Sequence, residues 1–487
     1  MSNTLHIVIV FAVSAVAAIA LAIAGGRNNK RTMIALKSLA LFYVLVTLWR
    51  SCMSDGFLFV INGGYYENVF YDVTDPLQSI LRWGLYISAT VSVVAVFCDN
   101  KTFKNISICF CLPFALVSTF FYGDFIAYFM QPGTVLWYGF IMPEIVRHIQ
   151  FSLELILAIV LPLSLLLAER YVPFREREQV KNFFIVLPVT ILTLIPMYVP
   201  QSLWGYTSIT LSGFSEESIM VIGVAFIACF VLYAAVRFKS YAVRYSVCFY
   251  AALASMQLYT QMYMLGHTVS RIPLQLCDLA SYLFFICILF RIKSLFNFNI
   301  FANTLGAMIA LCEPDTASAV FAAWDFHFSM QHIWVLVVPI TFLTLRMFPR
   351  PDKKALKDCL IYFTVYFSVC AVTGTIINGF YPETGIRVNY FYLFNDRVLE
   401  VLPFMSWTKD WRILIGGRFE IYPIYLFLFF WVYYAACVGV YYLIKKLYKI
   451  ADEHFMLRRV RIQEKEERTG IKSNKKLFYD DEGIENA

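Results

Sequence analysis

Charged residues are scarce in this sequence. They make up 15% of its 487 positions, whereas 60% of the residues are hydrophobic. The mean hydropathy of +0.66 lies outside the range of water-soluble globular proteins, so that class is excluded. The composition therefore predicts an all-α fold, that of a polytopic helical membrane protein.

Several patterns of known chemistry are also missing. The 12 cysteines include no C-x-x-C pair, so the sequence indicates neither a zinc site nor a disulfide framework. No phosphate-binding loop and no cluster of metal ligands is present, so we expect no metal and no cofactor. No basic stripe interleaves with exposed aromatic residues, so the net charge of +7 indicates a membrane-surface bias and no nucleic-acid partner.

Thirteen apolar windows divide the chain, and each is a candidate membrane span of about 20 residues. They lie at residues 4–25, 33–52, 76–98, 105–121, 144–168, 182–203, 217–236, 242–266, 273–290, 298–312, 325–345, 358–378 and 421–444. The windows at 105–121 and 298–312 are short. The first window lacks a signal-peptide cleavage site, so we interpret it as a signal anchor.

The loops between the windows differ in charge. Loops after the odd-numbered windows are rich in lysine and arginine, whereas loops after the first five even-numbered windows carry only Arg271. The positive-inside rule then places the N-terminus outside and the C-terminus in the cytoplasm, and we expect the plasma membrane. The basic flank after the last window could contact anionic lipids, or it could be a simple stop-transfer flank.

Short matches recur in order between the two halves. The matching pairs are Pro76 and Pro273, Lys101 and Lys293, Asn105 and Asn297, and Phe151 and Phe328. Six windows per half give both copies the same orientation, so we predict two parallel repeats plus a final span. The expected domains are residues 1–205, 206–446 and a charged cytoplasmic tail, 447–487. In this register Cys277 falls opposite Ile80.

Two windows of the second half carry reactive side chains. Cys277 lies four residues past Pro273, roughly 6 Å into its helix, and His332 lies seven past Asp325, roughly 10 Å in. Both helices run inward from the outer face, so we expect the thiol and the imidazole at similar depth. A thiol beside an imidazole can attack an ester and hold the acyl group as a thioester. The alternative is structural, because a buried cysteine is usually a small hydrophobe and a histidine can bond a neighbouring helix.

Polar side chains surround both reactive groups. Gln275 and Asp278 flank the thiol, and His327 and Gln331 precede the imidazole. Packing alone does not require so many polar groups in apolar helices, so we predict that they contact substrate. His327 is a second candidate base, although it points away from the face of His332.

At these residues the second half resembles the YwaF-like integral membrane family, which includes the eukaryotic transmembrane protein 164. The matching segments, within about residues 217–446, are Pro273–Cys277, Gln331–His332 with Pro339 behind it, Val388–Leu393 and Glu420–Tyr425.

The resemblance implies a membrane-embedded acyltransferase that acts on phospholipid acyl chains. It implies catalytic roles for Cys277 and His332, and Asn389 and Tyr390 match a family motif that we group with the substrate-binding residues. The chain departs from the family at Gln275, where many members have histidine, and in its additional first half.

Three functions follow from these patterns. The first is a cysteine-dependent acyltransferase that moves a fatty acyl group between phospholipids and lysolipids near the outer leaflet, with His332 as base and then acid. The second is a lipid or small-molecule transporter or flippase, because parallel repeats are common in transporters. The third is a non-catalytic sensor or scaffold. Transport that persists in a variant without Cys277 would favour the transporter function over the acyltransferase function.

Overall fold

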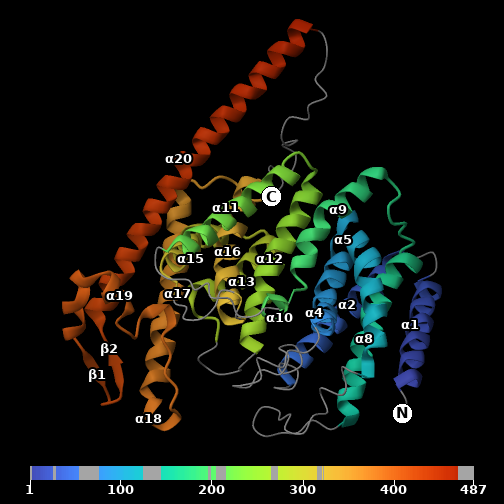
Figure 1. Ribbon diagram of the computed structural model, residues 1–487, viewed down its shortest axis with the longest axis horizontal. Coiled ribbons are helices and arrows are strands. Elements are labelled where there is room, and N and C mark those ends of the chain that lie inside the picture. The colour runs from blue at the N-terminus through green and yellow to red at the C-terminus, as the bar shows by residue number, and fades with distance from the viewer. Residues whose placement is uncertain are drawn as a thin grey trace. The chain divides into compact units, whose positions relative to one another are not determined.

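The computed structural model describes residues 3–25, 29–53, 76–123, 144–195, 199–204, 215–264, 272–314, 321 and 323–469 (Figure 1). The domain boundary expected at 205/206, Arg271 and the end of the tail lie outside these ranges. Contacts divide the chain into two compact units. Unit 1 holds Met1–Ser208 with Thr260–Gly266 and Ala319–His327, and unit 2 holds Ile209–Tyr259, His267–Ser318 and Phe328–Ala487.

Helices dominate the described chain. The first part contains α1 (Asn3–Gly25), α2 (Asn29–Met53), α4 (Pro76–Phe97), α5 (Lys101–Ile106), η2 (Ser107–Cys111), α6 (Leu112–Phe120), α8 (Glu144–Leu167), α9 (Arg177–Leu192) and α10 (Val199–Trp204). The second part contains α11 (Glu216–Val236), α12 (Tyr241–Met264), α13 (Leu276–Phe290), α14 (Lys293–Phe298), η5 (Asn299–Asn303), α15 (Thr304–Cys312), α16 (Ala323–Thr344), α17 (Lys353–Gly379) and α18 (Tyr381–Thr384). It ends with η6 (Tyr390–Tyr392), α19 (Arg397–Val401), η7 (Pro403–Asp410), β1 (Ile413–Ile415), β2 (Phe419–Ile421) and α20 (Pro423–Thr469).

Each predicted apolar window overlaps helical residues, although the window 182–203 covers parts of two helices, α9 and α10. Within the described residues, eight helices are long and apolar enough to cross a membrane. They are Thr4–Ala24, Lys101–Phe120, His148–Leu167, Glu216–Val236, Lys293–Cys312, Asp325–Thr344, Lys353–Gly379 and Pro423–His454. The protein is therefore an all-α integral membrane protein, whereas the count of thirteen spans is not established. The 15 residues of α13, for example, make about 22 Å of helix, less than the ~30 Å hydrocarbon core.

Each unit contains a 20-residue apolar helix with the same irregularity. In Lys101–Phe120 a π-helical turn occupies Ser107–Cys111, and in Lys293–Cys312 one occupies Asn299–Asn303. Both turns begin six residues after the lysine that starts the helix. A π-turn widens the helix by one residue and frequently marks a functional site.

Aromatic rings hold together the part of unit 2 that lies between α17 and α20. Phe391 of η6 packs edge-on against Tyr433, with ring centroids 4.9 Å apart, and against Phe363 at 5.9 Å. Phe391 has a φ of 52°, a left-handed backbone that is costly for a residue with a large side chain. The ring contacts offset this strain and fix η6 beside the two helices.

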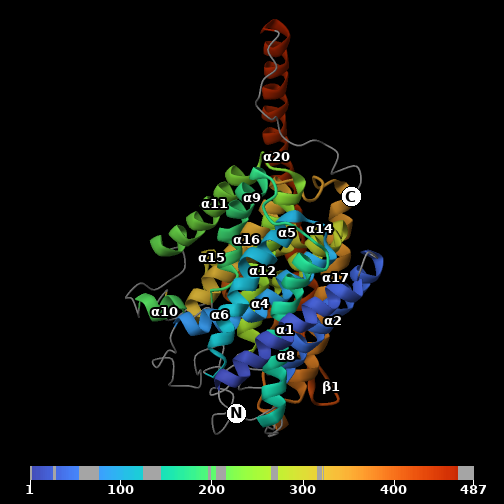
Figure 2. The ribbon, with the colours of Figure 1, turned by 90° about the vertical axis from the view of Figure 1, so that its right-hand side faces the viewer.

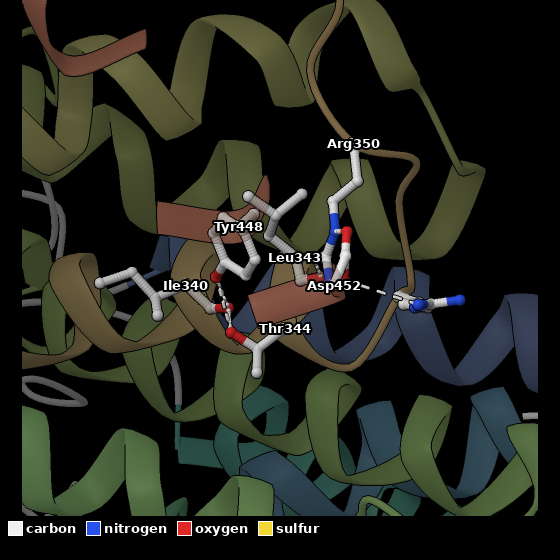
Figure 3. A network of polar contacts seen from close by, with 7 residues as sticks. Ile340, Leu343, Thr344, Arg350, Tyr448 and Asp452 are labelled. Atoms are coloured by element: carbon white, nitrogen blue, oxygen red, sulfur yellow. Dashed lines mark hydrogen bonds and ion pairs between the residues drawn. The ribbon is translucent and has the colours of Figure 1, made fainter. Parts of the chain in front are cut away.

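The single helix α20 starts directly after β2 (Figures 1 and 2). Farther along, it is tied to the end of α16 by a polar cluster that we define as Thr344, Arg346, Arg350, Tyr448 and Asp452 (Figure 3). Nε and Nη2 of Arg350 donate to the two carboxylate oxygens of Asp452 at 3.1 and 3.0 Å. The hydroxyls of Tyr448 and Thr344 lie 2.7 Å apart.

Candidate functional site

The helix that carries Cys277 begins later than the sequence indicated. It was expected to start at Pro273, but Gln275 is its N-cap, with extended backbone, and Leu276 is its first residue. The N–H of Leu279 donates to the carbonyl of Gln275 at 3.0 Å, the first hydrogen bond of the helix, so Pro273 and Leu274 lie ahead of it. Cys277 is thus only about 1.5 Å into the helix, in the first turn, where unsatisfied N–H groups form the positive end of the helix.

Two side-chain pairs show how α13 runs relative to α16. Near one end, Nε2 of Gln331 donates to Oδ1 of Asp278 at 2.9 Å. Farther along both helices, the rings of Phe284 and Phe342 meet edge-on with centroids 6.5 Å apart. The pairs occur in the same order along both helices, so α13 and α16 run parallel and side by side.

The Gln331–Asp278 bond also puts the two reactive residues at one level. Cys277 precedes Asp278, and His332 follows Gln331, so each lies about 1.5 Å along its helix from a bonded residue. His332 is about 14 Å from the start of α16 at Ala323. The helices therefore start at different levels, yet both reactive residues lie near the bonded pair.

The two reactive groups face different neighbours. Sγ of Cys277 lies 3.9 Å from the position that a Cβ on Gly306 would occupy, on the side of α15 and α20. Nδ1 of His332 lies 2.7 Å from the carbonyl oxygen of Phe328, and the two rings are 4.2 Å apart. Within the part of the chain that the structure describes, no hydrogen bond joins Sγ to the imidazole.

A residue that the sequence analysis missed, Tyr433 of α20, stands beside Cys277. Its hydroxyl donates to the carbonyl of Ala302 in η5 at 2.8 Å. The same hydroxyl is 3.2 Å from the position of a Cβ on Gly306, and Cδ2 of Leu276 is 3.1 Å from it. Gly306 therefore allows Tyr433 and the first turn of α13 to approach the backbone of α15 closely.

The π-turn η5 brings polar groups to this region. Asn299 and Asn303 are fully buried, and the amide of Asn303 donates to Oδ1 of Asn299. Among the described residues, Oδ1 of Asn303 and Oγ1 of Thr304 are buried without a hydrogen-bond partner. Asparagines inside the apolar window 298–312 were the available signal for this part of the site.

The structure brings Gln275 and Asn389 together, and their side-chain amides bind backbone groups. Nε2 of Gln275 donates to the carbonyl of Asn389 at 2.8 Å, and its Oε1 accepts from the N–H of Phe391 at 2.9 Å. Oδ1 of Asn389 accepts from the N–H of Phe394 at 2.9 Å. These bonds fix the loop 389–394 against the start of α13.

The other side of the same entry segment is held by α17. The carbonyl of Leu274 accepts from the hydroxyl of Tyr366 at 2.9 Å and from the thiol of Cys370 at 3.3 Å. Tyr390 is buried nearby, and burial raises its pKa to about 12, with a smaller contribution from Cys370. The phenol of Tyr390 is therefore neutral at physiological pH.

The remaining predicted site residue is His327. It is buried on α16, five residues before His332, and successive helical residues are about 100° apart, so the two rings point in different directions. Within the described residues, no three histidine, cysteine or acidic side chains are grouped so that they could hold a metal ion.

Comparison with known proteins gives one finding for the second part of the chain. Residues 210–442 match the model of the TMEM164 family. No curated protein and no solved structure matches the chain. The matched range contains every residue of the candidate site.

Proposed function

We propose that this multi-pass membrane protein, whose residues 210–442 match the model of the TMEM164 family, transfers fatty acyl groups between membrane lipids. The acyl group is carried as a thioester on Cys277. Donor and acceptor are phospholipids and lysolipids of the outer leaflet. Neither a metal nor a nucleic acid takes part.

The observation that carries this proposal is the placement of Cys277. Its thiol is in the first turn of α13, whose positive end favours an anion, and Tyr433 stands beside it near Gly306. The neighbouring residue Asp278 bonds α16, the helix of His332. A thiol, a phenol hydroxyl and an imidazole thus lie within one part of unit 2.

The hydrogen bond of His332 supports a role as base. The carbonyl of Phe328 can only accept, so Nδ1 carries the hydrogen. In the neutral ring Nε2 is then unprotonated and can accept a proton. Because Sγ and the ring are not bonded in this structure, proton transfer requires either a rotamer change of Cys277 or one bridging water.

The reaction has two steps. Sγ attacks the ester carbonyl of the donor, its proton passes to Nε2 of His332, and the lysolipid leaves with that proton as the C–O bond breaks. The acceptor hydroxyl then attacks the thioester and gives its proton to His332, which returns it to the departing thiolate.

The arrangement in the membrane is part of the same proposal. Thirteen spans form two parallel six-span repeats plus α20, within domains 1–205 and 206–446, and the tail 447–487 is cytoplasmic. The protein resides in the plasma membrane with its N-terminus outside, and the basic flank after the last span contacts anionic lipid. The matching π-turns of Lys101–Phe120 and Lys293–Cys312 support the repeat.

An acyl-exchange assay tests the chemistry. The purified protein in nanodiscs receives a phospholipid with a labelled acyl chain and an unlabelled lysolipid. Cys277→Ala should abolish transfer, and His332→Ala should lower it by about 10²- to 10⁴-fold, the usual contribution of a general acid–base. Cys312→Ala, which removes a half-buried thiol elsewhere, is the control and should keep full activity.

Full activity in both site variants at matched protein levels would refute the proposal. Lipid or solute flux in liposomes that persists in Cys277→Ala would instead favour the transporter function.

A further inference from the structure

Large apolar side chains are exposed in a segment outside the candidate spans. Seven of them occur within 15 residues, each between 49% and 64% exposed. They are Val401, Phe404, Trp407, Trp411, Ile413, Leu414 and Ile415. Water disfavours such exposure, because fully burying one of these side chains stabilises by about 1.5–3 kcal/mol.

In the hairpin β1–β2, both sides of strand β1 are exposed. Side chains alternate along a strand, so Ile413 and Ile415 point to one side and Leu414 to the other. All three are exposed, so both sides of β1 are apolar and open. An ordinary hairpin at a protein surface packs one side on the core and turns a polar side to water.

The segment lies at the ends of two candidate spans. It follows α17, which ends at Gly379, and leads from Ile421 to α20, which begins at Pro423. The ring of Phe419 in β2 packs on Gly379 so closely that a Cβ there would collide with it. The hairpin is therefore held beside the end of α17 and the start of α20 (Figure 1).

The charges of this segment balance. Residues 380–421 contain five basic and five acidic side chains, so the net charge is 5 − 5 = 0. Four ion pairs join most of them: Arg397–Glu400, Lys409–Asp396, Arg412–Glu420 and Arg418–Glu383. Such a surface fits the interface of a bilayer of zwitterionic lipids, which has no net charge. It has no excess positive charge that would attract anionic lipid.

We propose that residues 401–415 are an interfacial membrane-binding surface, immersed in the lipid head-group region at the ends of α17 and α20. Trp407 and Trp411 lie at head-group level, where tryptophan is enriched. The side chains of β1 reach the first acyl carbons, about 5–10 Å deep. The surface thereby fixes the depth of loop 389–394, and through Gln275 that of Cys277.

Quenching of tryptophan fluorescence by brominated lipids tests this surface on the full chain. The protein is placed in nanodiscs of phosphatidylcholine that carries bromines at either a shallow or a deep position of the acyl chain. We expect shallow bromines to quench more strongly, and Trp407→Phe with Trp411→Phe to lose that shallow component. Trp83→Phe, which alters a fully buried indole, should leave the shallow component intact.

Lipid composition and a second measurement complete the test. The quenching should be equal with and without phosphatidylserine, and a phosphatidylcholine with a shallow photoreactive group should crosslink to residues 401–415. Quenching that requires phosphatidylserine, or the absence of both quenching and crosslinks, would overturn the proposal. Unquenched Trp407 and Trp411 in a dimer that Leu414→Glu converts to monomer would instead make this surface a contact between copies of the chain.

Discussion

Gln275 was predicted to contact substrate, but its amide pairs with two backbone groups of loop 389–394. Gln275→Ala leaves the Phe391 N–H and the Asn389 carbonyl without these partners, so we expect the free energy of unfolding to fall by about 1–3 kcal/mol. Gln275→Glu keeps the acceptor for the Phe391 N–H and loses the donor to the Asn389 carbonyl. Its free energy of unfolding should therefore lie between those of the native chain and Gln275→Ala. The midpoints of thermal unfolding in detergent give the order of stability of the native chain and the two variants. An unchanged midpoint with a raised KM for lipid would restore the substrate-binding role.

Glu420 makes the stability of the hairpin β1–β2 depend on pH. The Tyr422 hydroxyl, which donates to Oε1 at 2.7 Å, and then Arg412, at 2.9 Å, hold its pKa below the ordinary value of 4.5. A lowered pKa stabilises the folded state at pH above 4.5, and that contribution is lost as the pH falls through the lowered value. The stability difference between the native chain and Glu420→Gln should therefore shrink from pH 7 to pH 4. A difference that is the same at both values would contradict this.

At the scale of single residues, the sequence predicts Cys277 and His332 as the reactive pair because polar side chains flank both of them inside apolar helices. It could not show that Sγ faces Gly306 and Tyr433 while the ring of His332 faces Phe328. Apolar windows give the position of a residue along a helix, whereas the neighbours that its side chain meets depend on how the helices pack.

At the scale of elements, the polar cluster joins α16, which carries His332, to α20, which carries Tyr433 (Figure 3). Arg350 and Asp452 are about one-third exposed, so their pair is partly screened, and we expect a coupling of about 1 kcal/mol in a double-mutant cycle. Arg350→Lys keeps the charge but loses the paired hydrogen bonds, so it should lose most of that coupling. Denaturant unfolding of Arg350→Ala, Asp452→Ala and the double variant measures it. Strictly additive effects would mean that the pair contributes nothing.

Helix ends were also where element prediction failed. The window 105–121 is shorter than the helix Lys101–Phe120, because a hydropathy window ends at charged residues. Lys104 is nevertheless buried, with its ammonium paired to Asp99 and Glu169. Pairing across loops is a tertiary feature, so hydropathy along the chain cannot detect it.

At the scale of the whole molecule, the helix ends allow a second register for the proposed repeat. The helices α4 and α13 end at Phe97 and Phe290, and an alignment of these two ends places Cys277 opposite Gly84 instead of Ile80. The offset between the π-turn helices aligns Gly306 with Phe114. In unit 1 the ring of Phe114 packs on Gly84, and in unit 2 Cys277 lies beside Gly306, so the small and the large side chain have changed places.

This exchange predicts what happens when an aromatic ring is introduced at Gly306 in the second half of the chain. Gly306→Phe should fill the space beside Cys277 and block its labelling by a membrane-permeant maleimide, together with acyl transfer. Gly223→Phe is the matched control, because nothing lies within 4 Å of a Cβ at Gly223. Equal labelling of Cys277 in both variants, with both folded, would contradict the placement of Cys277 beside Gly306.

The number of membrane crossings decides the orientation of the whole chain. Thirteen crossings place the two termini on opposite sides, whereas the eight long apolar helices alone would place them on the same side. In the proposed thirteen-span arrangement α13 crosses the bilayer, the helix Lys293–Cys312 returns across it, and α16 crosses in the same direction as α13. We therefore expect an N-terminal tag to be detected on intact cells and a C-terminal tag only after permeabilisation. Detection of both tags on one side would require an even number of crossings, so the thirteen-span arrangement would be wrong.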